Sequence, residues 1–328
     1  MSNVSTPRRY RPVHALGNPA LDALPTDRPL RVVSWNLQFC GGRREPWFYE
    51  GGTAVFVAPE DQARALAGVI EVLRALDADV VLLQEVERGS DRTSRRDQLQ
   101  ALVDGLDGYA AVSAAVHRHD FVPHPPRQFL RRMDMHLAIL ARAPLHHGTR
   151  TPLPGLRESS LRAHFNLHRA ILSATVPLTG GYSLPVANVH LSAFSGGDDT
   201  LVRQMGCVTE WMQAAAGPAL VGGDFNLLPP GDDPDRLPTD RTDHPRERSV
   251  LDAFFTRFPS VLPVALQRRP EAGTYLPPGA STPDRTLDWI FTTGEVAPVR
   301  AWVEPVDPFV SDHWPVVAEL RVGRTASV

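Results

Sequence analysis

The chain has 328 residues, of which 42% are hydrophobic and 22% charged, and its formal net charge is −3. This composition is typical of globular proteins, and no apolar stretch approaches the roughly 20 residues that a membrane helix needs. The small negative charge gives no global field that attracts nucleic acid, although a local basic rim would suffice for binding. All 34 basic side chains are arginines, which we attribute to compositional bias rather than to a substrate.

The first 28 residues are rich in proline and arginine and are expected to form a loosely ordered N-terminal arm. They contain no apolar segment like that of a secretory signal, which favours a cytoplasmic location. Residues 29–324 show no repeat and no linker, so we expect one α/β domain in a monomeric protein. Cys40 and Cys207 are expected to be reduced thiols.

The first half of the chain is expected to alternate strands and helices. Apolar runs predict strands at 31–37, 80–85, 109–116 and 135–141. Apolar residues at helical spacing predict helices at 60–76 and 98–106. Polar loops are expected at 38–59, 88–96 and 117–132.

The second half is expected to be richer in strands. The predicted strands are 170–176, 184–190, 218–221, 286–291 and 314–320. The predicted helices are 200–215 and 250–258, and a Pro/Asp-rich surface loop is expected at 229–248.

One apolar run ends abruptly in Asp224-Phe225-Asn226, directly after Gly222 and Gly223. The glycines are expected to let the backbone turn tightly. A carboxylate and an amide two residues apart can point the same way and hold a water or a hard cation. A strand-to-turn junction with Asx capping explains the same residues, so the pair alone leaves both interpretations open.

Polar side chains able to bind a metal or transfer protons occur at six strand ends. These ends are Trp35-Asn36, Gln84-Glu85, Asn188-Val189-His190, Asp224-Phe225-Asn226, Leu287-Asp288-Trp289 and Ser311-Asp312-His313. If the ends converge, so many acids would repel one another or take up protons unless a cation lies among them. An oxygen-rich set favours Mg²⁺ or Mn²⁺ over Zn²⁺.

These motifs and their order resemble the endonuclease/exonuclease/phosphatase superfamily, which includes pancreatic-type DNase, abasic-site endonucleases, inositol polyphosphate 5-phosphatases and neutral sphingomyelinases. The resemblance covers residues 31–322. It implies a four-layer α/β/β/α sandwich with two central, mostly antiparallel β-sheets and a site among the strand ends at one edge. It also implies a Mg²⁺-dependent phosphoesterase, with a phosphodiester favoured over a monoester.

The same resemblance implies roles for the metal-side residues. Asn36, Glu85 and Asp312 would be metal ligands, with Glu85 the primary carboxylate. Asp224 would activate or orient the attacking water, and Asn226 would hold that water or a phosphate oxygen.

The implied imidazole side of the site contains two histidines. His313 would face the scissile phosphate while Asp288 accepts its other N–H, which would fix the tautomer and raise the pKa of the imidazole. His190 matches a second imidazole of the DNase and sphingomyelinase branches, and Asp134 is a candidate partner for it. Arg169 is either a supporting residue of the site or a packing residue.

The substrate stays open among nucleic acid, a phospholipid head group and a soluble phosphate compound. The alternatives are a phosphomonoesterase of the inositol-phosphatase type and a binding module that keeps the fold without turnover. His117-Arg118-His119-Asp120 resembles a metal cluster, but it lies in a polar segment. The arginines at 43–44, 92–96 and 127–132 are expected to be solvated, and the aromatic residues at 47–49 to pin their loop to the body.

Overall fold

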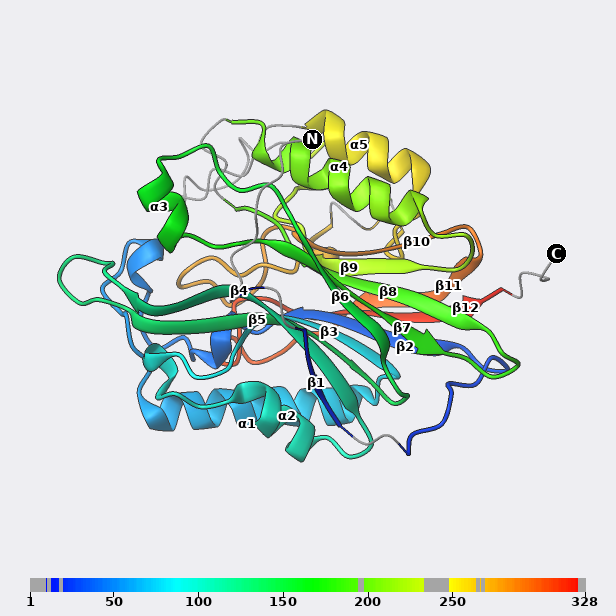
Figure 1. Cartoon of the computed structure of the whole chain (residues 1–328), viewed down its shortest axis with the longest axis horizontal. Helices are drawn as coiled ribbons and strands as arrows, with labels where there is room; N and C mark the ends of the chain where they lie inside the picture. The colour runs from blue at the N-terminus through cyan, green and yellow to red at the C-terminus, as the bar shows by residue number, and fades with distance from the viewer. Residues whose placement is uncertain are drawn as a thin grey trace.

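Two β-sheets stack face to face between two layers of helices in a computed structural model of the chain (Figure 1). The structure describes residue 10 and residues 13–17, 20–193, 198–232, 248–263, 266 and 269–323. Helices α1 and α2 cover the outer face of one sheet, and α4 and α5 cover the outer face of the other. The expected four-layer sandwich is confirmed.

The larger sheet has seven strands in the order β1-β4-β5-β3-β2-β12-β11. Their bounds are β1 Val13–Leu16, β2 Leu30–Asn36, β3 Val80–Glu87, β4 Ala110–Val122, β5 Arg131–Ala141, β11 Val296–Val303 and β12 Val316–Val322. Only β2 and β3 pair in parallel; the other pairs are antiparallel. Because both faces of β2 and β3 are covered, these strands are almost continuously apolar.

The smaller sheet has five strands in the order β10-β9-β8-β7-β6. Their bounds are β6 His146–Pro152, β7 Ala170–Pro177, β8 Ser183–His190, β9 Leu220–Asp224 and β10 Asp288–Thr292. Strands β8 and β9 are parallel and the remaining pairs antiparallel, so both sheets are mostly antiparallel as expected.

The helices present one apolar face to the sheet beneath them. Their bounds are α1 Pro59–Leu76, α2 Gln98–Gly105, α3 Ser160–Phe165, α4 Thr200–Gln213 and α5 Arg248–Arg257, with short 3₁₀ turns η2 Gln38–Cys40, η3 Phe48–Glu50, η4 Asp91–Thr93 and η6 Pro270–Ala272. Helix α1 starts with a proline, which needs no intrahelical N–H partner there, and carries two acids in its first turn. None of the described helices is both long and apolar enough to cross a membrane.

Three apolar clusters fill the spaces between the four layers. In β3, Leu82 packs between the sheets while Val81 and Leu83 pack under α1 and α2. This alternation follows from the two-residue period of a strand, so a single central strand serves two cores. The third cluster lies between the five-stranded sheet and helices α4 and α5. Such a rigid stack fixes where the strand ends lie.

The polar segments differ most from prediction. Half of the expected loop 117–132 is strand, because β4 continues to Val122 and β5 starts at Arg131. Backbone pairing in this long hairpin does not depend on apolar side chains. Strands β6 and β11 were not predicted either; both lie at sheet edges and are largely exposed, so they lack apolar alternation.

The N-terminal segment also differs from prediction. Within the expected arm, β1 pairs with β4 and Leu24 is buried and bridges to Leu178, so this part belongs to the sandwich. Residues 233–247 of the predicted 229–248 loop lie outside the described residues. Of the two cysteines, both free, Cys40 is buried and Cys207 half-buried.

Candidate active site

The two sheets bring the predicted strand ends to one place. On the five-stranded sheet, His190 and Asp288 are the register partners of Asp224 on either side, so three functional side chains come from adjacent strands. On the seven-stranded sheet, Asn36 ends β2 and Glu85 lies near the end of the parallel strand β3. Parallel strands deliver their carboxyl ends to one edge of a sheet, which explains the convergence.

The glycines before Asp224 serve close packing, not the tight turn expected from the sequence. Strand β9 runs straight through Gly222 and Gly223. A Cβ at Gly223, where φ is +148°, would lie 1.9 Å from the carbonyl oxygen of Val189. A Cβ at Gly222 would lie 2.7 Å from Leu82 Cδ1 on the facing sheet. The glycines therefore let β8 and the opposite sheet approach the strand that carries Asp224.

Asp224 and Asn226 form an Asx turn inside the site. The backbone N–H of Asn226 donates to Asp224 Oδ1 at 2.9 Å, and Asn226 adopts a left-handed φ of 52°. Its side-chain Nδ2 donates to the Leu191 carbonyl at 3.0 Å. Asp224 is only 2% exposed. The capped turn and the polar cluster are thus one structure, and the two interpretations of this motif do not exclude each other.

Glu85 reaches the site through a bulge in β3. The pairing of β3 with β5 shifts register between Leu83 and Val86, and Glu85 has a positive φ of 57°. A bulge re-aims one side chain, and a strained non-glycine conformation persists only where the surroundings hold it. The strain therefore places a carboxylate where a regular strand would not.

Two buried amides join the sheets behind the site. Gln84 Nε2 donates to Asn188 Oδ1 at 2.7 Å, and Asn188 Nδ2 donates to the carbonyls of Leu83 and Ala138 at 2.8 Å each. Gln84 precedes Glu85 and Asn188 lies two residues before His190, so the link positions both. Both amides appear in the sequence motifs, but nothing in those motifs indicates that they bind each other.

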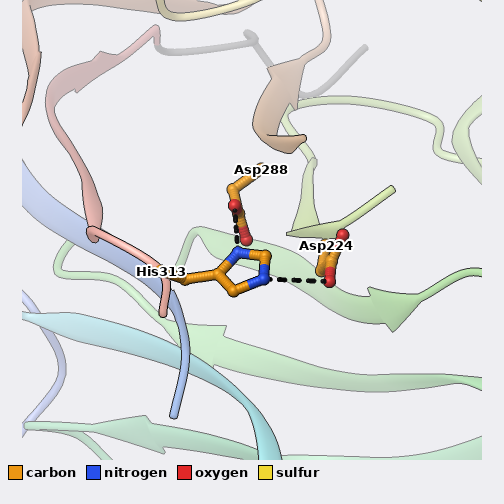
Figure 2. Close-up of side chains that lie close together, drawn as sticks. All are labelled: Asp224, Asp288 and His313. Atoms are coloured by element: carbon orange, nitrogen blue, oxygen red, sulfur yellow. Dashed lines mark hydrogen bonds and ion pairs between the residues drawn. The ribbon is translucent and has the colours of Figure 1, made fainter. Parts of the chain in front are cut away.

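The central pair is Asp288 and His313, shown with Asp224 in Figure 2. His313 Nδ1 lies 2.7 Å from Asp288 Oδ2, and His313 Nε2 lies 3.8 Å from Asp224 Oδ2. Burial opposes protonation of His313, but the charges of Asp288 and Asp312, the hydrogen bond to Asp288 and the charge of Asp224 raise its pKa to about 10. His313 is therefore an imidazolium at neutral pH, held by Asp288 as the sequence predicted.

Two acids of the cluster bind protons unusually strongly. Burial and the charge of Asp288 raise the pKa of Asp224 to about 7. The charge of His313 and the hydrogen bonds from Asn36 and the backbone of Asn226 act in the opposite direction. Burial likewise raises the pKa of Asp312 to about 7, and its Oδ1 has no hydrogen-bond partner. This is the excess of buried negative charge that the motifs predicted.

Asn36 lies between the carboxylates. Its Nδ2 is 3.1 Å from Asp224 Oδ2 and 3.4 Å from Glu85 Oε1, while its Oδ1 accepts the backbone N–H of Gln38. As placed, the amide stabilises two acids as a donor. Binding a cation through its oxygen requires the amide to turn over.

His190 and Arg169 complete the polar wall. His190 Nε2 lies 3.4 Å from Asp224 Oδ2. Burial, Arg169 and His313 keep the pKa of His190 well below its usual value, so this imidazole is neutral. Burial lowers the pKa of Arg169 to about 10, which the charges of Glu85 and Asp224 partly offset, so Arg169 stays charged at neutral pH. Its Nη1 has no hydrogen-bond partner although the side chain is buried.

Asp134 is not the partner of His190, so that expectation is wrong. Asp134 Oδ1 binds His136 Nε2 at 2.8 Å, and both line a separate cavity of about 210 Å³ with Arg88 and Arg118. Met133 and Met135 line the large cavity at the candidate site. Since successive residues of a strand face opposite sides, Asp134 must point away from that site.

The described residues contain one set of three His, Cys, Asp or Glu side chains whose ligand atoms lie within 4.8 Å of one another: Asp224, Asp288 and His313. In this set His313 Nδ1 is already bound to Asp288. A hydrogen-bonded acid–imidazole pair has no need of an ion between its members, because each satisfies the other. The acids without such a partner, Glu85 and Asp312, are better placed to hold a cation.

The site lines a cavity of about 430 Å³, within the range of small-molecule sites. Asn36, Glu85, His190, Asp224, Asn226, Asp312 and His313 all contribute to its surface. Asp288 lies behind His313 and is fully buried.

Most arginines near the site are paired. Arg44 binds Asp61, Arg92 binds Glu87 and Arg95 binds Asp91, at 2.5–2.6 Å. The guanidinium groups of Arg44, Arg92 and Arg95 are therefore engaged by carboxylates within the protein. Of the His117–Asp120 segment, His117 Nε2 lies 3.0 Å from the carbonyl of Phe165, which supports a packing role.

Comparison with known proteins agrees with this geometry. The model of the Endonuclease/Exonuclease/phosphatase family matches residues 33–313. A search of curated proteins finds no match. Among solved structures, an endonuclease/exonuclease/phosphatase from Beutenbergia cavernae DSM 12333 is 24% identical with a TM-score of 0.64, covering 90% of this chain and 72% of that one.

Two further structures show the same fold at lower identity. The human nocturnin catalytic domain, solved with a bound sulfate anion, is 19% identical with a TM-score of 0.58 over 96% of this chain and 98% of that one. The mannosyl-6-phosphatase Bt3783 of Bacteroides thetaiotaomicron VPI-5482 is 18% identical with a TM-score of 0.57 over 89% and 99%. The chain thus belongs to the endonuclease/exonuclease/phosphatase family of hydrolytic phosphoesterases.

Proposed function

We propose that the protein is a Mg²⁺-dependent phosphodiesterase, with Mn²⁺ as a substitute, that hydrolyses its substrate by in-line attack of water. The observation that carries the proposal is the convergence of Glu85, Asp224 and Asp312 on one cavity beside the hydrogen-bonded Asp288–His313 pair. Burial and the charge of Asp288 raise the pKa of Asp224 to about 7. A group with a pKa near the working pH is the best general base.

The donor set fits a hard divalent cation. Asp312 Oδ1 is buried without a partner, and Glu85 is aimed into the same cavity by a strained bulge. Glu85 and Asp312 would hold the ion, with Asn36 once its amide turns. When bound, such an ion polarises phosphoryl oxygens and stabilises the charge that develops in the reaction.

The remaining residues perform the proton and charge chemistry. Asp224 accepts a proton from the water whose oxygen bonds to phosphorus, while the opposite phosphorus–oxygen ester bond breaks and the departing oxygen takes a proton from solvent. Attack and departure occur on opposite sides of phosphorus. His313 lies 3.8 Å from Asp224, on the attack side, so it donates to a non-bridging phosphate oxygen instead of the leaving group.

Arg169 and His190 bind the phosphate in this proposal. Arg169 has an unpartnered Nη1, and guanidinium groups suit phosphate oxygens. Neutral His190 supplies one N–H donor without adding charge. Asn226 is held rigidly by its bond to Leu191 and orients the water beside Asp224.

A phosphodiester fits better than a monoester because the described lining has little spare positive charge. Of its two arginines, Arg92 is bound to Glu87 at 2.6 Å, which leaves Arg169. A monoester dianion would bring one more negative charge to a cavity lined by four carboxyl side chains: Glu50, Glu85, Asp224 and Asp312.

The test is hydrolysis of bis(4-nitrophenyl) phosphate with Mg²⁺ or Mn²⁺, with and without EDTA. We expect metal-dependent turnover by the wild type and a loss of at least about 10²-fold in Asp224→Ala, the lower bound for a general base. Glu210→Ala, at an exposed position of α4, is the matched acidic control and should retain full turnover. Wild-type turnover that survives EDTA, or an unaffected Asp224→Ala, would sink the proposal.

A further inference from the structure

The cavity continues beyond the catalytic side chains into an apolar compartment. Its apolar walls are Phe48 and Tyr49 from the loop after β2, Leu130, Met133 and Met135 from the β4–β5 hairpin, and Leu167. The same cavity lining also contains the polar side chains of Glu50, His117, His124 and Asn166. The polar groups needed for phosphodiester hydrolysis are all accounted for elsewhere in the cavity. A hydrolytic site for a phosphate alone does not need this apolar surface.

The compartment is built on a small apolar cluster of its own. Val55, Val122, Leu130 and Met133 are buried together, with Phe48 and Phe56 packed against them, apart from the three cores between the layers. Met133 is 2% exposed and Leu130 6%. This cluster ties the loop after β2 to the β4–β5 hairpin, so the walls are formed before a substrate binds.

The chemistry of these walls selects what they can take. A sugar or inositol hydroxyl placed directly against the leucine, methionine and phenylalanine side chains would lose its bonds to water, and these side chains offer no hydrogen-bond partner in return. An alkyl or aryl group loses nothing and removes apolar surface from water. Methionine side chains also adapt to irregular apolar shapes.

The positive charges in the cavity lining suit a substrate with a single phosphate that carries an apolar group. Within the described lining, Arg169 is the guanidinium left for a phosphate once Arg92 is bound to Glu87. A second phosphate of a nucleic-acid backbone would find no matching cation inside the cavity.

We propose that the compartment binds an apolar alkyl or aryl group esterified to the scissile phosphate, so that the substrate is an amphiphilic phosphodiester. Phe48 and Tyr49 are its specificity-determining residues, because they line the compartment yet are partly exposed and can be replaced without opening a main core. This inference rests on the proposed phosphodiesterase function.

The test measures kcat/KM with Mg²⁺ for a series of 4-nitrophenyl phosphodiesters whose second ester group is methyl, butyl, octyl, phenyl or 5′-thymidyl. Each pair of buried methylenes should raise kcat/KM by roughly tenfold. We expect kcat/KM for the octyl or the phenyl ester to exceed that for the methyl ester at least tenfold. Which of the two esters is preferred distinguishes an alkyl from an aryl group. The octyl-to-methyl ratio should fall toward one in Phe48→Ser and in Tyr49→Ser.

Val299→Ser is the matched control, because Val299 is 55% exposed on β11 and outside the cavity. It should keep the wild-type ratio, and thermal melting of each variant checks that it folds. A wild-type ratio near one, or a preference for the thymidyl ester, would overturn the inference while leaving the phosphodiesterase intact. No turnover of any ester would instead contradict the proposed function itself.

Discussion

Two buried Asp–His pairs in this molecule have nearly the same geometry and opposite electrostatics. Asp288 and His313 are 2.7 Å apart among acids at the candidate site. Asp134 and His136 are 2.8 Å apart in a cavity lined by Arg88, Arg118 and Arg132. The pKa of His313 is raised to about 10. Burial lowers the pKa of His136, and Arg88 and His14 add to that effect against the charge of Asp134.

A buried Asp–His pair therefore does not by itself define a catalytic site. Burial penalises the charged imidazole in both places, and the neighbouring charges decide the outcome. Surplus carboxylates keep His313 protonated, so it can donate to phosphate. Burial, with a smaller contribution from the charges of Arg88 and His14, lowers the pKa of His136, so its pair is expected to serve the fold. The following predictions test this contrast in order of expected effect.

Removing each imidazole should give the largest contrast. His313→Ala deletes a donor to the reacting phosphate, so kcat should fall by about 10²–10⁴-fold. His136 does not line the cavity of the site. His136→Ala therefore removes no group that would touch the substrate, and its kcat should stay within about threefold of the wild-type value. Steady-state hydrolysis of bis(4-nitrophenyl) phosphate measures both. Equal losses in the two variants would remove the distinction between the pairs.

Neutralising the acid of the Asp288–His313 pair should shift the pH profile of kcat. Asp288→Asn keeps the shape but removes the charge that helps to raise the pKa of His313 to about 10. The basic limb of kcat against pH, where His313 loses its proton, should therefore move to lower pH. An unchanged basic limb would show that His313 is not the group that titrates there.

Neutralising the acid of the other pair should affect stability instead. Asp134 Oδ1 lies 2.8 Å from His136 Nε2, and the backbone N–H of Asp134 donates to Ser90 Oγ at 2.8 Å. Asp134→Asn should lower the free energy of unfolding by about 1–3 kcal/mol, the cost of weakening a buried, charged hydrogen bond. Urea denaturation at pH 7 measures this, and kcat should stay near the wild-type value. A large fall in kcat with no change in stability would contradict the structural role.

The smallest expected effect is the pH dependence of that stability difference. Burial opposes ionisation of Asp134, but the hydrogen bond and charge of His136 and the charges of Arg118 and Arg132 lower its pKa. The folded state then binds fewer protons than the unfolded state, so this stabilisation is present above the unfolded pKa of about 3.9 and is lost below it. The difference in the free energy of unfolding between wild type and Asp134→Asn should therefore narrow as pH falls below about 4.

The site was predictable because its residues end apolar strands. The apolar pattern identifies strands that have functional candidates at or near their ends, and parallel pairing brings such ends together. These candidates are Asn36, Glu85, His190, Asp224 and Asp288. Two sheets with helices were likewise expected from the alternation of apolar periods. The catalytic roles of these residues stay predictions.

Other features depend on contacts that no local pattern carries. The Gln84–Asn188 link joins residues 104 positions apart. The glycines before Asp224 were expected to turn, because their close neighbours, Val189 and Leu82, are known only from the packing. Asp134 was misassigned because the face of β5 that it occupies depends on the register of a hairpin whose polar half resembled a loop.

The most direct test of the account is an NMR titration of the histidine rings in the metal-free protein, with His313→Gln and His136→Gln variants to assign the signals. We predict that His313 stays protonated at neutral pH and titrates near pH 10, while His136 titrates below the usual histidine value. If both rings titrated near the unperturbed pKa of about 6.5, or if their order were reversed, the surrounding charges would not set the roles of the two pairs.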